Sequence, residues 1–277
     1  MRHIVRRLLI QPENYNAMDT ALQTPSQRML NKVPQVTLYF WVIKIMATTV
    51  GETAADFLNT NLHLGLTNTS ILIGSLLVAA LVGQFRKDRY VPWIYWVSVV
   101  LISVVGTLIT DNLTDNFGVP LKMTTAAFAA ALAVTFGLWF ASEKTLSIHT
   151  IFTTRREWFY WAAILFTFAL GTAAGDLLAE SMKLGYFNSA LIFGAGIAIV
   201  TLCFYLFKVN AILAFWLAYI LTRPFGASFG DLLSQPVANG GLGLGTVGTS
   251  ALFFAVILVL IVYMTKAQRR PTAVAPQ

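Results

Sequence analysis

Four stretches of the chain place an aspartate in otherwise apolar sequence with one repeated spacing. Each contains Gly, four residues, Asp, one residue and Leu, and they read "GETAADFL" (51–58), "GTLITDNL" (106–113), "GTAAGDLL" (171–178) and "GASFGDLL" (226–233). A carboxylate in apolar surroundings is costly unless it faces a cavity, pairs with another charge or binds something positive. The first functional candidates are therefore Asp56, Asp111, Asp176 and Asp231.

Further polar residues lie at multiples of four positions from these aspartates, which places them on one face of an α-helix. The four polar series are Lys44, Thr48, Glu52 and Asp56; Ser103, Thr107, Asp111 and Asp115; Thr172, Asp176 and Glu180; and Arg223 with Asp231. These faces hold seven of the 12 acidic residues of the chain and only two basic ones. The acids therefore exceed the charge partners available on the same helices.

Carboxylate and hydroxyl oxygens are the ligands that hard divalent cations such as Mg²⁺ and Mn²⁺ prefer. We expect a cation pathway lined by Glu52, Asp56, Thr107, Asp111, Asp115, Thr172, Asp176, Glu180 and Asp231. The four motif aspartates are the predicted metal ligands. Two alternatives stay open: clustered carboxylates can relay protons, and the acids can be solvated helix ends or structural hydrogen-bond acceptors.

Two basic residues inside the apolar segments are the expected charge partners of this pathway. Lys44 is predicted either as the counter-charge of Glu52 or as part of a coupling switch, and Glu52 departs from the other repeats opposite Arg223. Arg223 begins "RPFGASFGD", where Pro224 predicts a kinked or broken helix of the kind that transporters place at their binding sites.

The aspartate motif belongs to a longer repeat, because a tryptophan stands ten residues before each motif glycine. These pairs are Trp41 and Gly51, Trp96 and Gly106, Trp161 and Gly171, and Trp216 and Gly226, and each tryptophan follows another aromatic residue. The glycines are 55, 65 and 55 residues apart, which indicates internal duplication. We expect the glycines to allow close helix packing and the tryptophans to lie in the aromatic belts at the membrane surface.

The composition excludes an ordinary soluble domain. Of the 277 residues, 57% are hydrophobic and 11% are charged, against about 25% charged in soluble globular proteins. Eight segments approach the ~20 apolar residues of a membrane helix, near 36–58, 70–85, 90–113, 123–141, 158–178, 187–207, 211–233 and 246–265. The predicted fold is an all-α integral membrane protein with eight transmembrane helices, arranged as four tandem helical hairpins in two parallel halves with the motif helices inside.

The basic residues predict the orientation. Of 19 Lys and Arg, 15 lie in the two tails and in the links after even-numbered segments, so both termini are expected in the cytoplasm. The motif aspartates then lie near the outer boundary, with Glu52, Thr107 and Thr172 about one turn deeper. The expected divisions are an N-terminal tail at 1–32, membrane halves at 33–141 and 158–268, a cytoplasmic linker at 142–157 and a C-terminal tail at 269–277.

The repeats, together with the phrases "SIHTIFTTRREWFYW" and "ALGTAAGDL", resemble a bacterial family of uncharacterised membrane-anchored proteins. That family is described as four tandem repeats of unknown function, each with two transmembrane spans and a recurring Trp. The resemblance covers about residues 33–268. It implies a bacterial inner membrane and the repeat architecture, and it supplies no catalytic residues.

The leading functional expectation is an inner-membrane transporter of cations, with a divalent metal such as Mn²⁺ or Mg²⁺ favoured and export preferred over import. The alternatives are proton-coupled transport of an organic solute or monovalent cation, and a membrane scaffold or regulatory subunit that transports nothing. No catalytic motif, cofactor motif or nucleic-acid-binding module is visible. The expected partners are the lipid bilayer and a small inorganic cation, and assembly as a homo-oligomer is left open.

Overall fold

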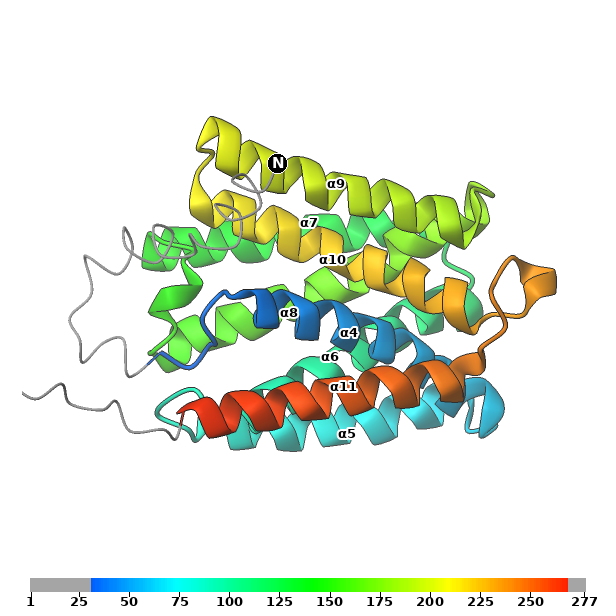
Figure 1. The fold of residues 1–277 in the computed structure, drawn as a ribbon, viewed down its shortest axis with the longest axis horizontal. Coiled ribbons are helices and arrows are strands. Elements are labelled where there is room, and N and C mark those ends of the chain that lie inside the picture. Colours follow the sequence, from blue (N-terminus) through cyan, green and yellow to red (C-terminus); the bar gives the residue numbers. More distant parts are fainter. Residues whose placement is uncertain (1–30, 269–277) are drawn as a thin grey trace, which may run out of the picture.

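The computed structural model describes residues 31–268, and this part of the chain is helical without strands. Its eight long helices are α4 (Leu38–Asp56), α5 (Gly65–Phe85), α6 (Pro92–Asp111), α7 (Leu121–Glu143), α8 (Thr154–Asp176), α9 (Gly185–Phe207), α10 (Ala211–Ser234) and α11 (Gly245–Gln268). They run along one common direction, and α4 begins at the end of the bundle where α11 finishes (Figure 1). The predicted terminal tails fall largely outside the described residues.

Seven of these helices are long and apolar enough to cross a membrane. The exception is α4, which has 19 residues but is less apolar because Lys44 and Glu52 lie in it. Both side chains are buried within the protein. The helix is therefore polar on a face that the other helices cover, which is where a membrane protein keeps charged groups.

The helices form an inner and an outer layer. In α6, α8 and α10 between 56% and 67% of the apolar stretch is buried, whereas in α5, α7, α9 and α11 the share is only 11% to 22%. The inner helices α4, α6, α8 and α10 pack in a closed ring, each against the next and α10 against α4. Since these four helices carry the aspartate motif, the prediction that the motif helices lie inside is confirmed.

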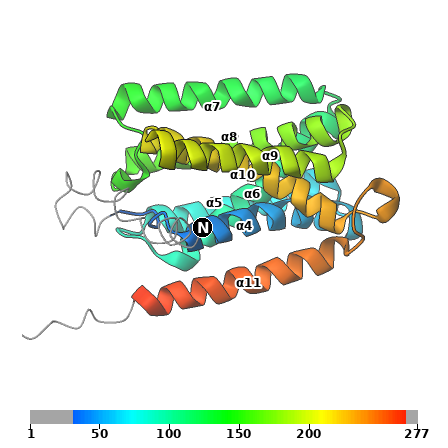
Figure 2. The same ribbon diagram turned by 45° about the horizontal axis from the view of Figure 1, so that its top comes forward.

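Each outer helix packs mainly on the inner helix of the following repeat. The pairs are α5 on α6, α7 on α8, α9 on α10 and α11 on α4, and α7 and α11 lie on opposite sides of the bundle (Figure 2). In the first three repeats the two long helices of one repeat make only marginal contact with each other. The two helices of a predicted hairpin therefore follow each other in sequence but do not pack mainly on each other. Each repeat buries its inner helix against the outer helix of an adjacent repeat.

The motif glycines set the spacing of the inner helices. A methyl group on Gly51 would overlap Ser103, and the same holds for Gly106 against Phe168, Gly171 against Arg223 and Gly226 against Thr48. The opposing residue is in every case the one three positions before the next glycine in the ring. This cyclic relation confirms that the glycines permit close packing, and it gives the inner bundle its fourfold pattern.

Three inner helices end alike, immediately after the aspartate. A single π-helical turn follows Asp56, Asp111 and Asp176, at Phe57–Asn61, Asn112–Asn116 and Leu177–Ser181. The fourth inner helix, α10, instead stays α-helical from Ala211 to Ser234. It also continues through Pro224, so the alternative of a broken helix is wrong.

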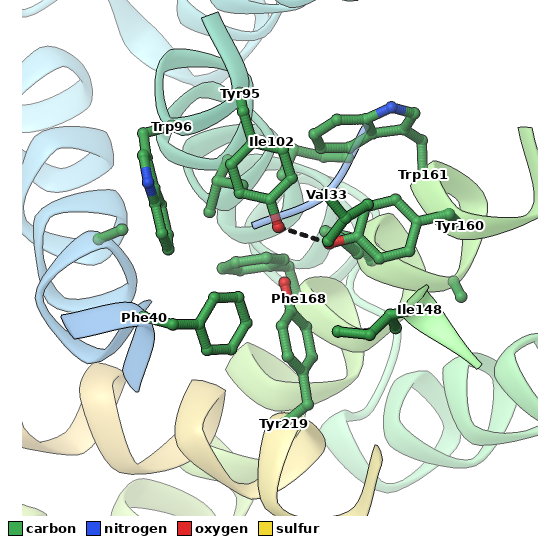
Figure 3. Packing of buried hydrophobic residues seen from close by; sticks show 14 of the residues in the cluster. Val33, Phe40, Tyr95, Trp96, Ile102, Ile148, Tyr160, Trp161, Phe168 and Tyr219 are labelled. Carbon is green, nitrogen blue, oxygen red and sulfur yellow. Dashed lines mark hydrogen bonds between the residues drawn. The ribbon is translucent and has the colours of Figure 1, made fainter. Parts of the chain in front are cut away.

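The opposite end of the inner ring is closed by aromatic side chains and two segments outside the long helices, the second of which contains one 3₁₀ turn at Ile148–Thr150. Trp41 is partly exposed, but Trp96, Trp161 and Trp216 are 1% to 4% exposed, so the prediction of a surface belt is wrong for these three. They pack instead in the core with the aromatic residues that precede them. Segments 31–37 and 144–153 lie over this end and insert Val33 and Ile148 beside Tyr95 and Tyr160 (Figure 3).

Candidate functional site

The side chains on the axis of the inner ring form successive layers, one for each turn of the four helices. Starting from the aromatic end, the layers are Phe40, Tyr95, Tyr160 and Phe215; Lys44, Val99, Ile164 and Tyr219; Thr48, Ser103, Phe168 and Arg223; Glu52, Thr107, Thr172 and Ala227; and Asp56, Asp111, Asp176 and Asp231. The first four layers are buried throughout, whereas three of the four aspartates are only half-buried. Polarity and exposure therefore both increase toward the aspartate end.

Arg223 joins all four inner helices in the layer of Glu52. Its Nη2 donates to Glu52 Oε2 at 2.8 Å, to Thr172 Oγ1 at 2.7 Å and to Thr107 Oγ1, and its Nη1 donates to the Thr48 carbonyl at 3.2 Å. Arg223 is completely buried and Glu52 is 5% exposed. A buried ion pair of this kind needs hydrogen bonds to its remaining groups; the two threonines provide two of them, and the Arg223 Nε–H is left without a partner.

The threonines also connect this layer internally. Thr107 Oγ1 donates to Glu52 Oε2 at 3.2 Å and lies 3.4 Å from Thr172 Oγ1. The three residues of the Glu52 layer predicted as pathway members thus meet at one point. The layer is filled by protein groups in this conformation, so an ion that moved along the axis would have to displace Arg223.

Lys44 does not pair with Glu52, and that alternative of the sequence analysis is wrong. Its Nζ lies 4.2 Å from the centroid of the Phe168 ring and 4.3 Å from that of Tyr219, and it makes no hydrogen bond. Each cation–π contact contributes about 2 kcal/mol when desolvated, while the penalty for burying an ammonium is several kcal/mol. Glu52 is satisfied by Arg223 instead, since that guanidinium lies in the adjacent layer.

The four motif aspartates form a ring at the more exposed end of the axis. The carboxylate of Asp111 is close enough to interact electrostatically with that of Asp56. Asp176 interacts in the same way with Asp111 and Asp231, and Asp231 interacts with Asp56. The ring follows the order of the inner helices. Its polar contacts are few: Gln235 Nε2 donates to Asp56 Oδ2 at 3.3 Å.

The remaining predicted acids lie one turn further out. Asp115 and Glu180 are exposed, and both fall within the π-helical turns that follow α6 and α8. Glu180 still lies within electrostatic reach of Asp56, Asp176 and Asp231. The structure therefore brings all seven predicted acids to one half of the axis.

No three His, Cys, Asp or Glu side chains of residues 31–268 lie close enough together to hold a metal ion. To coordinate an ion jointly, the four aspartates would have to approach one another or contact it through water. Their role as metal ligands stays a prediction, and what the structure establishes is a group of acidic side chains at one end of the axis, one turn beyond a buried ion pair.

The sequence analysis missed two polar features at the aromatic end. Tyr95 and Tyr160 share a hydrogen bond of 2.5 Å between their hydroxyls, and Tyr219 points toward this pair (Figure 3). The sequence does contain a signal for this pair, because both tyrosines occupy the aromatic position directly before the repeat tryptophan.

The second feature anchors segment 31–37. Lys32 Nζ lies 2.7 Å from Glu157 Oε2, and Gln84 Nε2 donates to Glu157 Oε1 at 3.1 Å. All three residues are buried. Lys32 was assigned to the tail by its position in the sequence, and no spacing pointed to Glu157, which lies 125 residues further along.

A comparison with protein-family models agrees with the duplication. The family described as Repeat of Unknown Function (DUF347) matches residues 39–90, 94–145, 159–210 and 214–270. These four matches correspond to the pairs of one inner and one outer helix. No curated protein and no solved structure matches the chain. Because the repeats cover most of the sequence, the chain belongs to the DUF347 repeat family as four tandem copies.

Proposed function

We propose that the chain is a multi-pass transporter of cations in the bacterial inner membrane, with all eight helices crossing the bilayer. The observation that carries the proposal is the ring of four aspartates at one end of the inner helices, directly above the buried pair of Glu52 and Arg223. A cluster of acidic side chains attracts cations, and clustered carboxylates inside a membrane bundle are typical of ion pathways.

The distribution of basic residues supports an orientation with both termini in the cytoplasm. The links after α5, α7 and α9 carry Arg86, Arg89, Lys144 and Lys208, and Arg155 and Arg156 lie in the first turn of α8. They lie at the end of the bundle opposite the aspartates, which then face the outside. In this orientation α4 crosses the bilayer with its polar face covered by the other helices.

Glu52 and Arg223 supply the barrier in this proposal. A positive guanidinium on the axis repels cations, so the pathway is closed while Arg223 holds Glu52, Thr107 and Thr172. A cation bound at the aspartate ring weakens the attraction between Arg223 and the acids above it, which favours separation of the pair. Cation binding at the aspartate ring and opening of the barrier are thereby coupled through one residue.

A divalent metal such as Mn²⁺ or Mg²⁺ remains the first candidate substrate, because its preferred ligands are carboxylate and hydroxyl oxygens. Transport of a monovalent cation or an organic solute driven by protons is the second candidate. It is favoured by the spacing of the aspartates, which form no three-residue metal site as they stand.

The test is flux into proteoliposomes that contain the purified protein. Asp56, Asp111, Asp176 and Asp231 are replaced singly by Asn, and Mn²⁺, Mg²⁺ and K⁺ movement is measured with and without a pH gradient. We expect reduced flux in every variant, and metal dependence or pH dependence selects the substrate class. Wild-type protein that moves none of these ions, and instead copurifies with a stable partner, would support a scaffold and overturn transport.

A further inference from the structure

Lys44 is the least satisfied charged group on the central axis. Its side chain is fully buried, its Nζ makes no hydrogen bond, and the four ion pairs formed among residues 31–268 do not include it. Two aromatic ring faces lie near the ammonium, at 4.2 Å and 4.3 Å from their centroids. Ring faces attract a cation but leave its three N–H groups without a true acceptor.

A second cation lies beside the same ring. The Arg223 Cζ is 5.5 Å from the centroid of Phe168, the ring that Lys44 also contacts, and the two side chains are within electrostatic reach of each other. Nη1 and Nη2 of Arg223 are used by the neighbouring layer, but its Nε–H has no partner. The hydroxyl of Tyr219 is also buried without a partner.

The charges in this part of the axis do not balance. Glu52 is held by Arg223 at 2.8 Å, and on α4 it stands eight residues, about two turns, from Lys44. The aspartate ring lies one turn beyond Glu52, on the far side from Lys44. Lys44 and Arg223 therefore have one nearby carboxylate between them, that of Glu52, which is already paired with Arg223. The polar atoms around Phe168 that lack partners are N–H and O–H donors.

We infer that Lys44 binds a small monovalent anion on the axis, chloride or a small carboxylate such as formate, held between Lys44, Tyr219 and Arg223. Donors without acceptors and an excess positive charge are the composition of an anion site. The anion serves as a resident counter-charge, so this inference goes beyond transport and is independent of it.

The test uses the purified protein in nanodiscs, without any flux measurement. Thermal unfolding is followed in sodium chloride, bromide, formate and gluconate at constant ionic strength. We expect saturable stabilisation by small anions and none by gluconate. At a hundred times the dissociation constant, the unfolding equilibrium constant falls roughly 100-fold.

Two variants assign the effect to Lys44. Lys44→Met keeps the length of the side chain and removes the charge, and it should abolish the anion response. Lys122→Met removes an exposed lysine from α7 and should leave that response intact. Stabilisation by chloride, by formate or by both supports the site and separates halide from carboxylate. An identical response in Lys44→Met and wild type overturns it.

A second measurement covers the case in which Lys44→Met does not fold. The ³⁵Cl resonance of chloride is recorded with wild-type protein in nanodiscs and with empty nanodiscs. Line broadening that appears only with protein, and that bromide or formate removes by competition, supports the site. Equal line widths in both samples, together with no saturable change in thermal unfolding, overturn it, whatever the outcome of the transport assays.

Discussion

Arg223 reaches Glu52 from the layer before it, and the two residues stand at different positions of the repeat. Three residues before the motif glycine, the other repeats have Thr48, Ser103 and Phe168, so only the fourth places a cation there. One residue after the glycine, only the first repeat has an acid, and the fourth has Ala227. Both departures meet in one ion pair of 2.8 Å, so two of the breaks in the fourfold pattern lie at one point of the axis.

Removing one member of this pair should destabilise the protein strongly. Glu52→Gln leaves the buried guanidinium of Arg223 without its counter-charge, and losses of about 3–5 kcal/mol are usual for a broken buried pair. The measurement is the free energy of unfolding in detergent by chemical denaturation. The double variant Glu52→Gln with Arg223→Met should recover most of the loss, because no unpaired charge remains. A double variant that is less stable than Glu52→Gln alone contradicts this account.

The glycine contacts predict a matched pair of substitutions. Gly171→Ala places a methyl group against the Cβ and Cγ atoms of Arg223, and overpacking of this kind costs about 1–3 kcal/mol. Gly137→Ala lies on the outer helix α7 with no atom near the new methyl group. It should be neutral or slightly stabilising, since alanine is the better helix former. Equal thermal stability of the two variants would refute the proposed role of the motif glycines.

Much of the fold can be predicted from the sequence because the same residue pattern occurs in all four repeats. The positions of the inner helices, their polar faces and the close approach at each glycine are all visible in the spacing. The spacing does not show which helices are neighbours, because it gives the polar or apolar face of a helix and says nothing about which helix packs on that face. This is why the outer helices were paired within their own repeat, although α5 packs on α6 rather than on α4.

The same limit explains the errors at the site. Lys44 and Glu52 share a face of α4, and sequence alone makes them natural partners. The nearer partner of Glu52 comes from a helix 171 residues away, one layer closer along the axis. The tryptophans were expected at the membrane surface because they follow the cytoplasmic charges. Three of the four are buried, because segments 31–37 and 144–153 cover that end.

The buried pair of Lys32 and Glu157 should hold segment 31–37 on the bundle. Glu157→Gln keeps the shape of the side chain but removes the charge that Lys32 contacts at 2.7 Å. We expect a loss of stability and faster proteolysis of the segment, because its cation is left buried without a partner. Asp88→Asn, on the exposed link after α5, is the control and should match wild type. Equal protease protection in all three proteins would show that the ion pair does not anchor the segment.

The acids of the axis should differ in their contribution to cation flux according to their depth. Asp231 is 8% exposed and belongs to the ring, whereas Asp115 is exposed one turn further out. In the proposed transporter, Asp231→Asn removes a charge from a site shielded from water, where electrostatic interactions are strongest. Asp115→Asn removes one that solvent screens. We expect tenfold or greater loss of flux at low cation concentration for Asp231→Asn, and less than threefold for Asp115→Asn. Raising the salt concentration should reduce the second effect but not the first. A larger loss for Asp115→Asn would place the selective site among the exposed acids beyond the ring rather than in the ring.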